Sequence, residues 1–186
     1  MNNSSPTSAN DSWLRTLYFT RAVFSIIWVA LVFTVAKGST PVASVLLVLY
    51  PAWDALANVL DARRSGGIAA NPIQAINAAL SAAAAIAMAA AVGRGLPAVF
   101  IVFGIWAGVS GLLQLGVAVR RWKHSGAQWP MALSGAQSAL AGAFFVMQAN
   151  GPAPMLQQLA GYAAVGAFYF LISASVLVYR QRAALR

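Results

Sequence analysis

The chain has 186 residues, of which 60% are hydrophobic and only 8% are charged. Soluble domains contain about 45–50% apolar and about 25% charged residues, so this composition excludes an ordinary soluble protein and indicates that lipid surrounds most of the chain. Twelve Lys and Arg against three Asp give a net charge of +9, but the basic residues gather at the ends of apolar segments, which is typical of membrane topology signals and excludes a nucleic-acid-binding face.

Six apolar segments, each long enough to cross a bilayer as a helix, follow a polar tail. We expect residues 1–13 to be a disordered tail. Five of the six segments begin with a proline in the first turn, where a missing N–H costs no helical hydrogen bond. The segments cover about residues 14–36, 41–60, 72–92, 96–119, 129–147 and 154–179.

Every second segment ends in a basic cluster, which indicates an internal repeat. A spacing of 57 residues separates Arg63 from Arg120, and 60 residues separate Arg120 from Arg180. The sequence therefore predicts an all-α polytopic membrane protein with six transmembrane helices in one domain, residues 14–182. Its three pseudo-repeated helix hairpins cover about residues 14–64, 71–123 and 129–182, and a short basic tail, 183–186, follows.

The distribution of basic residues predicts the orientation in the membrane. Ten of the twelve fall on the side of the termini, and only Lys37 and Arg94 fall on the other side. Lys and Arg are enriched in cytoplasmic connections, so we expect both termini to be cytoplasmic. The expected partner on that side is the bilayer with its anionic headgroups.

Two pairs of opposite charges lie at matching depths in the first hairpin. Arg21 and Asp54 are each sixteen or seventeen residues from a turn near Gly38, which is about 25 Å at a helical rise of ~1.5 Å per residue. Arg15 and Asp61 are also equally far from this turn along the sequence. We expect an intramembrane ion pair between Arg21 and Asp54 and an interfacial pair between Arg15 and Asp61.

The intramembrane pair has two interpretations. It is either a structural link between two helices or a protonatable group bordering a polar path with Tyr18 and Asn58. A proton path across a membrane usually needs several protonatable groups, and this single ion pair has no further intramembrane acid beside it. The structural interpretation is therefore favoured.

Small residues predict close helix packing in the second half of the chain. The fourth segment contains Gly104 and Gly108 in a GxxxG motif, and the fifth contains Gly135 and Gly142. Such residues let helix backbones approach closely, within the chain or in a homo-oligomer. Gln74 and Gln114 are equidistant from the turn near Arg94, so we expect them to hydrogen-bond across the second hairpin.

The inventory of reactive side chains argues against an enzyme. The chain has one histidine, His124, and neither Glu nor Cys. No combination of nucleophile, base and orienting residue recurs, so we expect no catalytic residue, no cofactor and no metal site. His124 lies among cations and is interpreted as a solvated loop residue, with a pH-sensing role as the alternative.

Two stretches carry a resemblance to a known family, residues 103–122 (FGIWAGVSGLLQLGVAVRRW) and 133–154 (LSGAQSALAGAFFVMQANGPAP). Both stretches contain small residues spaced by one or two helical turns. The hairpins to which they belong have a proline after the short connection and end in a basic cluster. In these features they resemble the HdeD-like acid-resistance membrane proteins of bacteria. The resemblance extends over about residues 14–182 and implies an inner-membrane protein linked to acid stress, without catalytic residues. Arg21 and Trp28 stand in the first hairpin where the third has glycines.

The predicted function is therefore that of a non-enzymatic membrane protein of the acid-stress response. The alternative is a small channel or proton-linked carrier whose path passes Arg21 and Asp54.

Overall fold

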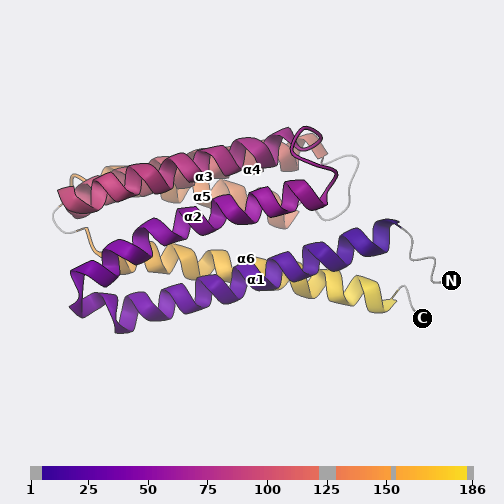
Figure 1. The fold of residues 1–186 in the computed structure, drawn as a ribbon, viewed down its shortest axis with the longest axis horizontal. Helices are drawn as coiled ribbons and strands as arrows, with labels where there is room; N and C mark the ends of the chain where they lie inside the picture. The colour runs from indigo at the N-terminus through magenta and orange to yellow at the C-terminus, as the bar shows by residue number, and fades with distance from the viewer. Residues whose placement is uncertain (1–5, 122–128, 152–153, 184–186) are drawn as a thin grey trace.

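The computed structural model describes residues 6–121, 129–151 and 154–183 of the chain. Within these residues the regular elements are all helical and there is no strand. They lie side by side in one elongated bundle (Figure 1). In chain order they are α1 (Pro6–Thr34), the 3₁₀ turn η1 (Ala36–Gly38), α2 (Thr40–Arg64), α3 (Pro72–Ala91), the 3₁₀ turn η2 (Val92–Arg94), α4 (Leu96–Arg121), α5 (Trp129–Gln148) and α6 (Leu156–Ala183).

The first helix starts earlier than the sequence predicted. Residues 6–13, expected to be disordered, form the first turns of α1. Pro6 is suited to a helix start because the first turn needs no N–H donor from it. Trp13 then fixes this part of α1 to α2 by donating from Nε1 to Asp61 Oδ1 at 3.2 Å.

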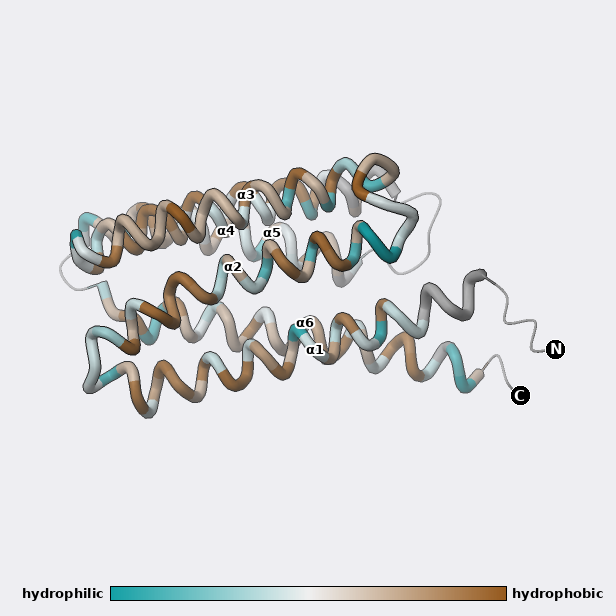
Figure 2. Tube along the Cα trace, in the orientation of Figure 1, coloured by the Kyte–Doolittle hydropathy of each residue, from teal (hydrophilic) through white to brown (hydrophobic). Residues whose placement is uncertain are grey.

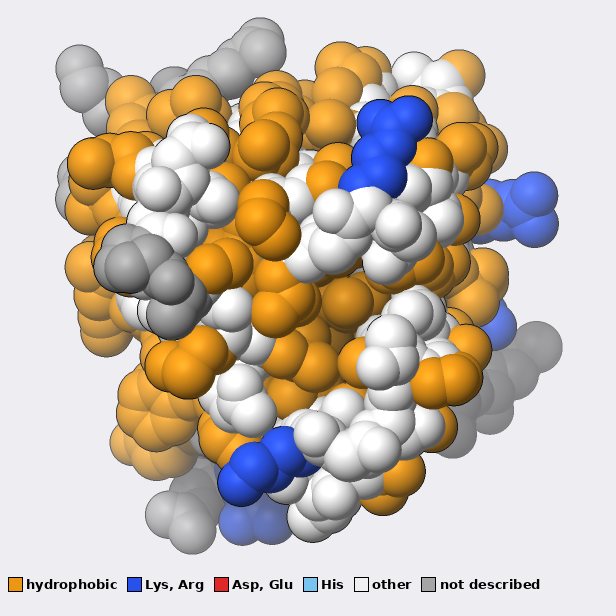
Figure 3. Space-filling view, turned by 90° about the vertical axis from the view of Figure 1, so that its left-hand side faces the viewer, with side chains coloured by type: hydrophobic (Ala, Val, Ile, Leu, Met, Phe, Trp, Pro, Cys, Tyr) orange, Lys and Arg blue, Asp and Glu red, His pale blue; other side chains and the backbone are white. Residues whose placement is uncertain are grey.

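The bundle has two different ends. The terminal end carries the start of α1, the end of α6 and the linker of residues 65–71 (Figure 1). The turn end carries η1 and η2, with Lys37 and Arg94. Its surface is mostly apolar or uncharged, with few basic side chains and no acidic one in view (Figure 3). The first and last helices therefore have their free ends on the same side of the bundle.

Each helix contacts the next one along the chain, and α6 returns to α1, so the six helices of the described chain close into a ring. The closeness of packing alternates around this ring. The extensively packed pairs are α4 with α5, α1 with α6 and α2 with α3, whereas α1 meets α2, and α5 meets α6, over few residues. The predicted hairpins thus describe how the helices are connected, while the tight packing joins helices of different hairpins.

The interior is filled by aromatic and small side chains, and many large aliphatic side chains point outward. Trp28, Phe100 and Phe103 are at most 1% exposed, whereas Ile86 and Leu140 are 75% and 73% exposed. Hydrophobic residues follow the helices along their length (Figure 2). Soluble proteins rarely expose continuous apolar surface on this scale, so the outer face of the bundle is suited to lipid.

Length and composition support several membrane crossings. By these criteria α1, α2, α3, α4 and α6 are long and apolar enough to span a bilayer. The 20-residue helix α5 is not among them in the part of the chain that the structure describes, and its sequence contains the polar residues Ser134, Gln137 and Ser138. The chain is thus consistent with a multi-pass helical membrane protein, and the crossing by α5 stays a prediction.

Candidate functional site

The strongest candidate site is a partly buried ion pair in the middle part of α1 and α2. Arg21 Nη1 lies 3.1 Å from Asp54 Oδ1, and the two side chains are only 14% and 25% exposed. The Arg21 guanidinium also lies 5.3 Å from the ring centroid of Phe170 on α6, which is a favourable cation–π distance. The structure therefore brings together the two charges expected from their depth and adds a contact with a third helix.

Asp54 is the centre of a larger hydrogen-bond network. Its Oδ2 atom accepts hydrogen bonds from Asn58 Nδ2 at 2.9 Å and from Ser81 Oγ on α3 at 2.7 Å. Ser81 is fully buried, and its Oγ accepts in turn from Trp106 Nε1 on α4 at 2.9 Å. Both carboxylate oxygens thus have donors, and the network joins α1, α2, α3 and α4. Polar networks of this kind help to fix the relative positions of the elements that they join, although Arg21 Nε is buried without a hydrogen-bond partner among the described residues.

Ser81 and Trp106 were not predicted as members of this network, although the sequence contained a signal for both. Counted along the sequence, Asp54 and Ser81 are almost equally far from the centre of the 65–71 linker. In the same way, Ser81 and Trp106 are almost equally far from η2. Ser81 is also the one hydroxyl residue in the alanine-rich α3. The depth argument that paired Arg21 with Asp54 therefore locates these two residues as well.

A second polar layer lies one helical turn nearer the terminal end. It contains Tyr18, Asn77 and Ser110, each three or four residues from a member of the network, and Asn58, which also belongs to the network itself. Asn77 Oδ1 and Ser110 Oγ are buried and have no hydrogen-bond partner in the described part of the chain. Polar atoms therefore continue from the ion pair toward the terminal end.

Aromatic rings fill the interior on the opposite side of the network, toward the turn end. The ring centroid of Tyr50 lies 4.6 Å from that of Trp28 and 6.2 Å from that of Phe103. Phe103 in turn lies 5.7 Å from Phe145 on α5. Trp28 is held in place because its Nε1 donates to the backbone oxygen of Leu46 at 2.7 Å. These rings separate the ion pair from the turn end.

The glycines predicted to support close packing meet at one interface, between α4 and α5. A Cβ atom on Gly104 would lie 2.7 Å from the backbone oxygen of Gly142, and one on Gly135 would lie 2.8 Å from that of Gly111. A Cβ on Gly142 would lie 2.5 Å from the backbone oxygen of Gly104. Gly108 differs, because its Cβ would lie 3.8 Å from Gly142 Cα, an ordinary contact. Three of the four predicted positions thus leave no room for a side chain.

The predicted interfacial pair between Arg15 and Asp61 is wrong. Arg15 Nη1 donates to Gln181 Oε1 on α6 at 2.7 Å, and Asp61 Oδ1 accepts from Trp13 Nε1. The physical reason is the packing of α1, which is extensive against α6 and sparse against α2. Two residues at the same depth therefore face different neighbours.

The predicted pair between Gln74 and Gln114 is also wrong. Gln114 Nε2 donates instead to the backbone oxygen of Met131 on α5 at 3.3 Å, because α4 packs more closely against α5 than against α3. His124 lies outside the residues that the structure describes. Within those residues, no three His, Cys, Asp or Glu side chains are grouped as ligands for a metal ion.

Comparison with known proteins relates part of the chain to a repeat family. No curated protein and no solved structure matches the chain. Residues 76–147, from α3 to the end of α5, match the family described as a short repeat of unknown function (DUF308), in which the HdeD-like proteins are included. This part of the chain is therefore similar to a repeat family without a defined activity.

Proposed function

We propose that the chain is a non-enzymatic, multi-pass protein of the bacterial inner membrane, with both termini in the cytoplasm. Its Arg21–Asp54 network is a structural link that holds the helices of the bundle together. Its role is protection of the cell envelope under acid stress. The resemblance to HdeD-like proteins and the match of residues 76–147 to a repeat family support this assignment.

One observation carries the structural role, namely that every oxygen of the Asp54 carboxylate is engaged. Arg21 occupies Oδ1, and Asn58 and Ser81 occupy Oδ2. A carboxylate that passes protons across a membrane needs access from both sides, and ionisable groups that serve transport line polar paths. The aromatic rings around Trp28 and Phe103, both at most 1% exposed, argue against such access from the turn end.

A small channel or proton-linked carrier is the second candidate. It is favoured by the polar layer on the terminal side, where Asn77 Oδ1 and Ser110 Oγ are buried without a hydrogen-bond partner among the residues that the structure describes. Buried polar atoms of this kind commonly bind internal water. Water there would give protons a route from the terminal end to Asp54, and transport would then require the aromatic rings to move.

The two candidates differ in how paired and single substitutions behave. Asp54→Asn leaves the Arg21 charge without its partner. Breaking a fully buried pair costs about 3–5 kcal/mol, and because this pair is partly exposed we expect a loss below that range. Combining Arg21→Gln with Asp54→Asn removes both charges, so we expect it to restore part of that loss. Arg63→Gln, at an exposed position on α2, is the control. Stability is measured by chemical unfolding in detergent micelles, and proton flux in proteoliposomes across a pH step.

The structural proposal predicts rescue in the double variant and the same flux in all variants as in empty liposomes. Flux in the wild type that disappears in a folded Asp54→Asn variant would show transport and overturn the structural role. The acid-stress role has a separate test. Cells that lack the protein should survive an acid shock less well than cells that contain it, and equal survival would contradict that role.

A further inference from the structure

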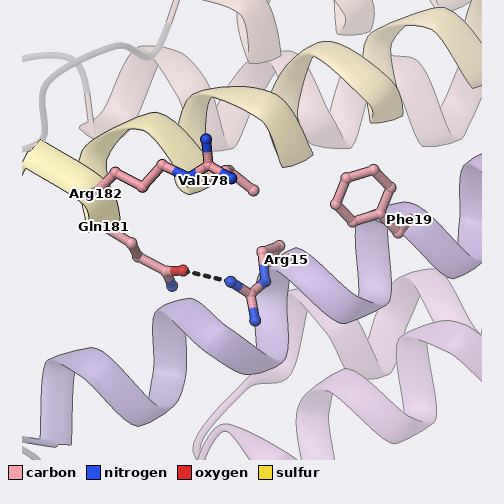
Figure 4. Close-up of a pocket in the computed structure, with 5 residues that line it drawn as sticks. All are labelled: Arg15, Phe19, Val178, Gln181 and Arg182. Carbon is pink, nitrogen blue, oxygen red and sulfur yellow. Dashed lines mark hydrogen bonds between the residues drawn. The ribbon is translucent and has the colours of Figure 1, made fainter.

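A groove between the free ends of α1 and α6 has the chemistry of a phosphate-binding site. It has a volume of about 400 Å³ and is lined by Arg15, Phe19, Val178, Gln181 and Arg182. These side chains come from the two facing helices and border the space between them (Figure 4).

The two arginines give the groove a positive charge that the described residues do not neutralise. Arg15 Nη1 donates to the uncharged Gln181, and among the described residues no carboxylate lies within 4.0 Å of Arg15 or Arg182. Asp61, an acid at this end of the bundle, is bonded to Trp13 instead. Guanidinium groups match the geometry of phosphate oxygens, and the groove therefore favours a phosphate over a cation or a neutral ligand.

The order of side chains along both helices matches a lipid better than a free ion. Phe19 follows Arg15 by four residues on α1, and Val178 precedes Arg182 by four residues on α6. Both apolar side chains therefore lie about 6 Å deeper in the bundle than the charged ones, at a rise of ~1.5 Å per residue. A phospholipid presents its phosphate and its acyl chain in the same order.

The depth of the groove also matches a membrane interface. Trp13 lies two residues before Arg15 in the chain, and the guanidinium of Arg64 lies 5.0 Å from its ring. Tryptophan and basic residues are enriched together at the level of the headgroups.

We propose that this groove binds an anionic phospholipid, with the phosphate between Arg15 and Arg182 and the acyl chain against Phe19 and Val178. The bound lipid bridges the first and last helices where the ring closes. The inference rests on the bundle lying in a bilayer. It does not depend on the role of Arg21 and Asp54, so the two can fail separately.

Native mass spectrometry of the full chain, purified in a neutral detergent, tests this inference. Phosphatidylglycerol, phosphatidylcholine and inorganic phosphate are titrated in parallel. We expect tight binding of phosphatidylglycerol, weaker binding of phosphatidylcholine and none of inorganic phosphate. Arg182→Gln changes an exposed side chain and should leave the fold intact while lowering the affinity for phosphatidylglycerol roughly fivefold, and adding Arg15→Gln should lower it roughly 25-fold.

Arg63→Gln is the matched control, because Arg63 is an exposed arginine at the same end of the bundle on α2. It should leave the affinity unchanged, and an equal loss in this variant would mean that general surface charge attracts the lipid. Val178→Ser should weaken long-chain phosphatidylglycerol more than a short-chain form. Equal affinity for phosphatidylcholine, or binding of inorganic phosphate as tight as that of the lipid, would overturn the proposal.

Discussion

The two glycines of the GxxxG motif in α4 should respond differently to the same substitution. At Gly104 a methyl group would lie 2.7 Å from the backbone oxygen of Gly142 and 3.0 Å from the backbone nitrogen of Val146. At Gly108 the nearest atom would be Gly142 Cα at 3.8 Å. Since the obstacles at Gly104 include backbone atoms of α5, no change of side-chain rotamer relieves them.

The expected difference follows from two opposing effects. Replacing Gly with Ala inside a helix stabilises it by roughly 0.5–1 kcal/mol in both variants. At Gly104, however, α4 and α5 must separate by about 0.7 Å to bring the methyl group to an ordinary contact of 3.4 Å, and overpacking of this kind costs about 1–3 kcal/mol. Gly104→Ala should therefore be about 1–3 kcal/mol less stable than Gly108→Ala.

Reversible unfolding in detergent micelles, followed by circular dichroism, measures this difference. Gly116→Ala is a control on the same helix, because a Cβ atom there meets nothing within 4 Å. Gly108→Ala and Gly116→Ala should both be at least as stable as the wild type. If Gly104→Ala and Gly108→Ala unfold alike, the backbone contact between α4 and α5 is not as described.

Three further predictions test the polar contacts. Ser81→Ala leaves the buried indole N–H of Trp106 without an acceptor and should lower the unfolding free energy by about 1–3 kcal/mol. The double variant with Ser81→Ala and Trp106→Phe should lose less than the sum of the two single variants. Trp28→Phe removes the hydrogen bond to the backbone oxygen of Leu46 and should lower the unfolding free energy by about 1–3 kcal/mol. Its control, Trp129→Phe, changes a residue that is 58% exposed and should stay within about 0.5 kcal/mol of the wild type in the same melting experiments. Asp61→Ala should lower the unfolding free energy by only about 0.5–1.5 kcal/mol, because Asp61 accepts a hydrogen bond from Trp13 and forms no ion pair within the described chain. A loss as large as that in Asp54→Asn would mean that Asp61 does form an ion pair.

The sequence predicted positions along the bundle axis well, because that coordinate depends only on helical rise and on where the turns lie. Arg21 and Asp54 met for this reason, and the same reasoning applies to Ser81 and Trp106. Prolines in the first turn marked the starts of α2 and α3. These features are local, so a single sequence contains them.

The sequence did not predict which helices lie side by side. The apolar segments are hydrophobic on all faces, so their composition gives little information on how each helix is rotated about its axis. Arg15 and Asp61 are at matching depths but face α6 and Trp13, respectively. The backbone contact between Gly104 and Gly142 likewise depends on the pairing of α4 with α5, which a GxxxG motif does not specify.

The pairing of α1 with α6 has a consequence for biosynthesis. Helix α1 leaves the ribosome well before α6, its main packing partner, and the Arg15–Gln181 bond spans 166 positions. Throughout translation, α1 must wait in the membrane with this face in contact with lipid or with an insertion factor. A nascent chain stalled before Leu156 should therefore be sensitive to proteolysis in α1, and this sensitivity should disappear only when α6 has been inserted.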